Sequence, residues 1–99
     1  MTKVRLSVLA EQDLLDIALY IAEDSPDRAV SFVGELQEAC NGLAEHPLRF
    51  PIIPGLEARG HRRRVHGRYA VVYRVEVDIV RVLRIVSSAM DMMQVIDGD

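Results

Sequence analysis

The sequence is poor in the residues that mark several protein classes. It has one cysteine, Cys40, so neither an intramolecular disulfide nor a cluster of thiolate ligands can form. No apolar run approaches the ~18–20 residues that a membrane-spanning helix needs, and the N-terminus lacks the apolar segment of a signal peptide. We therefore expect a protein of the reducing cytoplasm with no membrane partner, and we expect Cys40 to be a small core residue.

Metal-ligand patterns are also missing. His61 and His66 lie near each other in the sequence and His46 lies elsewhere, but no carboxylate or thiolate accompanies them at ligand spacing. We predict no metal site and no cofactor.

What is present is the composition of a small globular protein. The chain has 99 residues, of which 49% are hydrophobic and 27% charged. We expect one domain over residues 1–99, with 90–99 as a C-terminal tail that either covers the core or offers apolar side chains to a partner. A chain this short builds a small core, so stabilisation by a bound partner is expected.

The two halves of the chain differ in charge. Residues 1–46 carry three basic and nine acidic side chains, whereas residues 47–99 carry nine arginines and six acids. Lys3 is the only lysine. This split favours two surfaces that meet different partners, although charges that merely line solvent-exposed faces would give the same counts.

Two amphipathic helices are indicated in the first half. Ser7 is a suitable N-cap for a first helix, whose apolar residues recur at helical spacing from Leu14 to Ile21. Ser25 and Pro26 give the cap and first position of a second helix, which Pro47 ends. The short connection predicts an antiparallel helical hairpin.

Strands flank this hairpin. Lys3–Ser7 alternates apolar and basic residues, and three β-prone runs follow a loop at Leu48–Gly60: His61–His66, Tyr69–Glu76 and Ile79–Ser87. Their short connections allow only antiparallel hairpins. The sequence therefore predicts an α+β fold of order β-α-α-β-β-β, with the helical hairpin packed on a small antiparallel sheet and the first strand at its edge.

Several segments, in this order, resemble ParE-type toxins of the RelE/ParE toxin–antitoxin superfamily over residues 3–92. Leu6–Ile17 resembles the family's first strand and helix, Tyr20–Pro26 its inter-helix turn, and Leu43–Pro47 the close of its second helix. Gly67–Val75 is similar to the G-x-Y-x-x-x-Y-R-V centre of its sheet. The last strand departs from the family, because Ser87 and Met90 stand where a histidine and an arginine are usual, so the roles of those side chains in toxicity do not carry over.

The resemblance implies the toxin of a type II toxin–antitoxin pair, associated with plasmid stabilisation. It implies inhibition of DNA gyrase without catalysis by the toxin itself. The implied antitoxin is ParD-like, with a ribbon–helix–helix domain that alone contacts operator DNA. In toxins of this fold the antitoxin lays an apolar segment between helical hairpin and sheet, and the side chains we assign to that groove are Leu14, Ile17, Ile21, Tyr69 and Tyr73.

The competing hypothesis is a ribosome-dependent mRNA interferase of the RelE type. Such nucleases stabilise the phosphorane with cations and carry a tyrosine near the C-terminus. Here Ala70 stands where they carry an arginine, and no aromatic residue follows Tyr73. We therefore favour gyrase inhibition, predict no catalytic residue, and interpret Tyr69 and Tyr73 as core or groove residues. A third hypothesis is a toxin-like fold that has lost its toxicity and remains a binding module.

Arginines are concentrated between positions 59 and 68, with no acid among them. They indicate either a surface for an anionic partner, such as gyrase with its DNA or the acidic antitoxin, or an edge strand kept soluble by charge. Adjacent strand residues point to opposite faces, so only about half of them can share one surface. Our candidates for target binding are Arg59, Arg62, Arg63, Arg64, Arg68 and Arg84.

Overall fold

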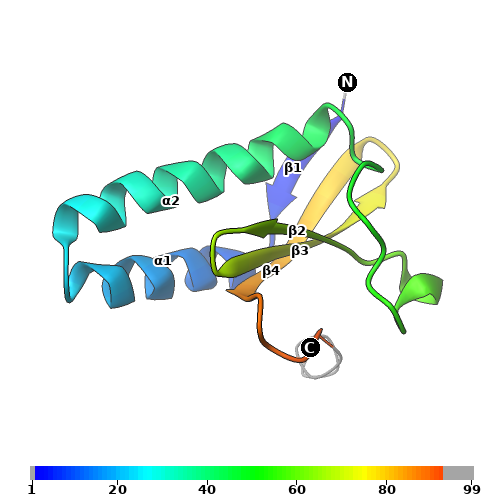
Figure 1. Ribbon diagram of the computed structural model, residues 1–99. Coiled ribbons are helices and arrows are strands. Elements are labelled where there is room, and N and C mark those ends of the chain that lie inside the picture. Colours follow the sequence, from blue (N-terminus) through cyan, green and yellow to red (C-terminus); the bar gives the residue numbers. More distant parts are fainter. Residues whose placement is uncertain (1, 93–99) are drawn as a thin grey trace.

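The computed structural model describes residues 2–92 and has the predicted α+β fold. A helical hairpin lies beside a four-stranded sheet and extends past one end of it (Figure 1). The elements are β1 (Lys3–Leu6), α1 (Val8–Ala22), α2 (Pro26–Asn41), β2 (Arg62–His66), β3 (Tyr69–Glu76) and β4 (Ile79–Ser87), with short 3-10 turns η1 (Gly42–Ala44) and η2 (Glu57–Arg59). The predicted order β-α-α-β-β-β is confirmed. Within residues 2–92, no helix has the length and apolar character needed to cross a bilayer.

Both helices begin at the serines that the sequence indicates. The Ser7 hydroxyl accepts a hydrogen bond from the Ala10 amide at 3.0 Å, and the Ser25 hydroxyl accepts one from the Arg28 amide at 3.2 Å. These bonds satisfy amides that the first helical turn leaves without a partner. The Ser7 hydroxyl also donates to the Leu83 carbonyl at 2.7 Å, which fastens the start of α1 to β4.

The strand order in the sheet is β1-β4-β3-β2. The first strand lies at the edge, as predicted, but it pairs with β4 in parallel, so the sheet is mixed. The reason is topological: the helical hairpin carries the chain between β1 and the meander, and such a crossover permits a parallel pair. The β2–β3 and β3–β4 pairs are antiparallel, as predicted.

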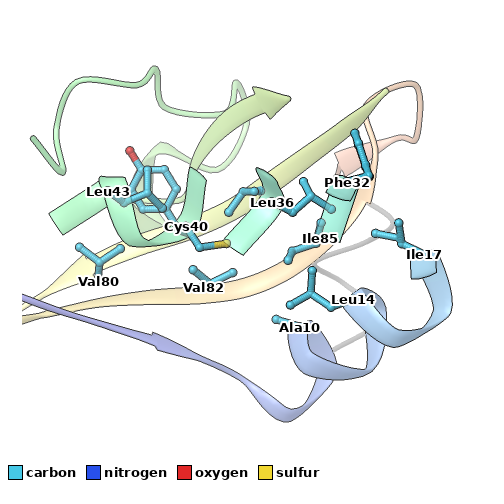
Figure 2. Close-up of a cluster of buried hydrophobic side chains, with 12 residues drawn as sticks. Ala10, Leu14, Ile17, Phe32, Leu36, Cys40, Leu43, Val80, Val82 and Ile85 are labelled. Carbon is cyan, nitrogen blue, oxygen red and sulfur yellow. The ribbon is translucent and has the colours of Figure 1, made fainter. Parts of the chain in front are cut away.

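The main core lies between the hairpin and the sheet (Figure 2). Leu36 and Leu43 from the helical side and Val80 and Val82 from β4 are fully buried. Cys40 is 2% exposed within this core, as expected of a small core residue, and burial raises the pKa of its thiol to about 11. The thiol is therefore protonated at neutral pH and a poor nucleophile.

A second core covers the opposite face of the sheet. The segment Leu48–Gly60, predicted only as a loop, contributes Ile53 and Leu56 to it, and both are buried against Val72. The loop is also tied to the sheet edge, because Ile52 forms a bridge with Arg62. Of the predicted tail, Met92 is buried in this second core and Met90 is 48% exposed, and residues 93–99 lie outside the described part.

Candidate functional site

Two of the candidate arginines bond to the protein's own backbone. Arg62 Nη1 donates to the Phe50 carbonyl at 2.6 Å and to the Leu48 carbonyl at 3.2 Å. Arg64 Nη1 donates to the Ala39 carbonyl at 2.8 Å, in the last turn of α2, where the helix dipole favours a cation. These guanidinium groups hold the loop and the end of α2 to β2, a role that their spacing does not reveal.

Arg84 has a partner on the hairpin. The pairing of β3 with β4 contains a β-bulge, because its register shifts between Val72 and Tyr73. The bulge changes the alternation of side chains along β4. Arg84 then reaches Asp13 of α1, with Nε 2.9 Å from Oδ2 and Nη2 3.1 Å from Oδ1. The two side chains are 25% and 12% exposed, so this pair joins α1 to the sheet rather than presenting a free cation.

The other three candidate arginines are Arg59, Arg63 and Arg68. Arg59 and Arg68 are exposed and Arg63 is half-buried. Within residues 2–92, neither Arg63 nor Arg68 has a guanidinium hydrogen bond or ion pair, in contrast to Arg62 and Arg64. As the strand alternation predicts, Arg62 and Arg64 contact the helix and loop side, and Arg63 lies on the opposite face of β2.

The predicted antitoxin groove between hairpin and sheet is filled by the chain's own core. Leu14 is 8% exposed, Ile17 6% and Tyr73 0%, so these three side chains offer no surface to a partner of the folded chain. Ile21 and Tyr69 are half-buried against the same core. The groove prediction is therefore wrong in placing an open surface at Leu14, Ile17 and Tyr73. The physical reason is that α1 and α2 pack directly on the sheet.

An open apolar groove lies instead between the two helices, toward their connecting turn. Its volume is about 670 Å³. Leu19 on α1 and Val30 on α2 are 61% and 77% exposed there, more than core packing alone would leave. The lining residues are Ala18, Leu19, Ala22, Pro26, Ala29, Val30, Val33, Gly34 and Gln37.

A charged cluster joins α2 to β2 and was not foreseen from the sequence. Arg28 Nη1 donates to Glu35 Oε2 at 2.6 Å, and His66 Nε2 lies 3.0 Å from Glu35 Oε1. The bond from Arg28, together with that from His66, lowers the pKa of Glu35. The Phe32 ring packs against His66 with centroids 5.6 Å apart. The seven-residue spacing of Arg28 and Glu35 places both on one helix face. That spacing is the one sequence signal for the cluster, and it indicates only the Arg28–Glu35 pair.

A small hollow of about 320 Å³ opens beside this cluster, bounded by Glu38, Gly42 and Arg64 as well as by Glu35 and His66. Two of these side chains, Glu35 and His66, already contact each other, and Arg64 donates to the Ala39 carbonyl. Within residues 2–92, no three histidine, cysteine, aspartate or glutamate side chains gather in a geometry for a metal ion.

Comparison with known proteins identifies the family. Residues 4–92 match the family model of the ParE toxin of the type II toxin–antitoxin system parDE. This chain belongs to the ParE toxin family. It is a toxin of a type II toxin–antitoxin system, as the order of its sequence segments indicated. No curated protein matches the chain.

Solved structures support the ParE fold. The chromosomal ParDE toxin–antitoxin system from P. aeruginosa has a chain that is 22% identical with a TM-score of 0.73, and the match covers 88% of this chain and 96% of that one. The toxin–antitoxin complex RelBE2 from Mycobacterium tuberculosis gives 23% identity and a TM-score of 0.65, with 87% and 96% covered. At these identities the likeness concerns the fold.

Three positions singled out in the sequence analysis, Ala70, Ser87 and Met90, lie in different surroundings. Ala70 is 0% exposed in the second core, beneath Ile53 and Leu56. Ser87 ends β4, and Met90 follows it in a turn where both are exposed. Ser87 and Met90 are thus on the surface, whereas Ala70 is enclosed by apolar side chains.

Proposed function

We propose that this toxin inhibits DNA gyrase in the cytoplasm without covalent chemistry of its own, and that a ParD-like antitoxin neutralises it. The antitoxin would carry the ribbon–helix–helix domain, so that operator DNA is bound through the antitoxin. The observation that carries the proposal is the apolar enclosure of Ala70. A cation at this position is what the competing nuclease mechanism would need beside the scissile phosphate.

Tyr73 adds support. Its hydroxyl donates to the Pro47 carbonyl at 2.7 Å, and the side chain is 0% exposed. Burial raises the pKa of Tyr73. A buried phenol with a raised pKa is a poor general base, and it cannot reach a ribose hydroxyl from inside the core.

The decisive experiment measures both activities with the purified toxin. We expect supercoiling by purified gyrase to fall as toxin is added, and primer extension on mRNA bound to translating ribosomes to show no new ends. Specific transcript cleavage with normal supercoiling would instead establish the interferase. Expression without the antitoxin separates the third hypothesis: growth arrest with filamentation supports gyrase inhibition, and harmless overexpression supports a toxin that has lost its activity.

We place the gyrase contact on the outward-facing arginines Arg63 and Arg68. Their guanidinium groups form no hydrogen bond or ion pair within residues 2–92, unlike those of Arg62, Arg64 and Arg84. The double variant R63Q/R68Q should therefore lose gyrase inhibition while keeping its thermal unfolding midpoint. Arg28→Gln, which removes a cation from the hairpin, is the control and should inhibit gyrase normally.

We place the antitoxin on the apolar groove of the hairpin. An amphipathic antitoxin helix could bury its apolar side there, against Leu19 and Val30, by the helix-in-groove mode. Val30→Glu should weaken binding of the cognate antitoxin, measured by titration calorimetry, and leave gyrase inhibition intact. Val77→Glu introduces the same charge at an 89% exposed valine in the β3–β4 turn and should bind the antitoxin normally.

A further inference from the structure

Three arginines lie side by side across three neighbouring strands. Arg5 of β1 is the register partner of Arg81 of β4, and Arg81 is the partner of Arg74 of β3. Strands lie about 4.8 Å apart, so the three side chains leave the sheet within ~10 Å of one another. Like charges directly opposite each other destabilise a sheet. We call Arg5, Arg81 and Arg74 the arginine row.

The arginine row lies on the face of the sheet turned away from the helices. Its strand neighbours Val80 and Val82 point into the main core, and alternation places Arg81 on the opposite side. The same alternation puts Lys3, two residues before Arg5, on the row's face. Lys3 and Arg5 are exposed, and the side chains of Arg74 and Arg81 are 44% and 36% exposed.

One carboxylate accompanies these four cations. Glu76 accepts hydrogen bonds from Arg74 Nε at 2.8 Å and from Arg81 Nε at 2.9 Å. Among the strand residues described on this face, no other acid is present, and Asp78 lies in the adjoining turn. The face therefore keeps an excess of positive charge, although the whole chain has a net charge of −3.

The chemistry of the row matches phosphate groups. Guanidinium groups bind phosphate oxygens in bidentate fashion, and evenly spaced cations suit a repeating anion. The described strand residues of this face include no aromatic side chain, since Tyr69 and Tyr73 belong to the helix-side core. Without a surface on which bases stack, a single strand has little to bind, and the backbone of a duplex is favoured.

We propose that the arginine row binds the phosphate backbone of duplex DNA without reading its sequence. The choice of DNA over duplex RNA rests on the proposed function, because gyrase works on DNA. The acidic hairpin on the other side of the sheet then points away from the duplex, which orients the toxin on it.

The test measures binding of the whole toxin to a labelled DNA duplex of ~20 base pairs, about two helical turns, by fluorescence anisotropy without gyrase. We expect binding at low salt, with a slope of log K against log salt of about −2.7 to −3.6, as three or four phosphate contacts predict. The same measurement uses duplex RNA of equal length and phosphatidylserine vesicles. Absence of DNA binding, or preferential binding to RNA or vesicles, would overturn the proposal and leave gyrase inhibition to its own assay.

Matched variants separate the row from overall charge. Arg5→Gln should weaken DNA binding and reduce the salt slope by about one, whereas Arg28→Gln, with the same change of net charge, should not. Glu76→Gln should strengthen binding several-fold, because it removes the carboxylate that competes for Arg74 and Arg81. Glu23→Gln on the exposed hairpin turn is its control. Equal effects within either pair would contradict a role of the row.

Discussion

Asp13 of α1 and Arg84 of β4 form a two-point ion pair between the helices and the sheet. Both carboxylate oxygens of Asp13 accept hydrogen bonds from the Arg84 guanidinium, and Oδ2 also accepts one from the Ile85 amide at 2.9 Å. The carboxylate thus satisfies a cation and a backbone donor at the β-bulge of β4. Arg84 is therefore better explained by the fold than by target binding.

The first prediction concerns this link. Asp13→Ala should lower the free energy of unfolding by about 2–4 kcal/mol, because it leaves a partly buried guanidinium and a strand amide without their acceptor. Asp13→Asn should have a smaller effect, since the amide oxygen still accepts from Ile85. Urea unfolding measures both. Asp16→Ala, on the exposed side of the same helix, should change stability by less than about 0.5 kcal/mol; an equal loss there would contradict the assignment.

A second prediction divides the arginine-rich segment into structural and surface residues. Arg64→Met should lower the unfolding free energy by about 1–2 kcal/mol, because the Ala39 carbonyl loses its charged donor. Arg68→Gln, in the exposed turn between β2 and β3, should leave stability within about 0.5 kcal/mol of wild type. Thermal unfolding followed by circular dichroism checks the pair. Equal melting temperatures of the two variants would show that the hydrogen bond from Arg64 to the Ala39 carbonyl does not stabilise the fold.

The parts of the fold that could be predicted are those with local signals. Ser25 and Pro26 mark the start of α2 because cap chemistry acts within one turn, and β-prone runs with short connections mark β3 and β4. The parallel pairing of β1 and the burial of Ile53 and Leu56 depend on contacts between distant segments. Asp13 and Arg84 are 71 positions apart, so no spacing rule could join them.

The candidate site likewise has features that the sequence could predict and features that it could not. The concentration of arginines is visible in the sequence. Which of them bond to the protein's own backbone and which lie on the open surface depends on which face of β2 meets α2. The groove prediction placed Leu14, Ile17 and Tyr73 at a surface because apolar spacing cannot distinguish a core from a docking site. The arginine row was missed because it is assembled from three strands.

A third prediction compares a glycine in the left-handed backbone region with a glycine inside a right-handed helix. Gly67 has a φ of 59°, in the left-handed region, so Gly67→Ala should destabilise the toxin by about 1–2 kcal/mol. Gly34 lies inside α2, and a Cβ added there would meet no atom within 4 Å, so Gly34→Ala should stabilise the toxin by about 0.8–1 kcal/mol. Chemical unfolding of the two variants should shift in opposite directions, and a common direction would contradict this account.

The last prediction is a pH dependence set by Glu35. Its pKa is lowered in the folded state by Arg28 and then by His66, so the unfolded chain binds the proton more readily. The stabilisation is complete above the ordinary carboxyl pKa of 4.5 and is lost as the pH falls through the lower folded value. Glu35→Gln should therefore flatten the decline of stability below about pH 4.5, measured by urea unfolding across that range. Arg28→Met should flatten it as well, although it changes the net charge in the opposite sense. If the two variants instead moved the profile in opposite directions, net charge and not the Arg28–Glu35–His66 contact would govern the acid response.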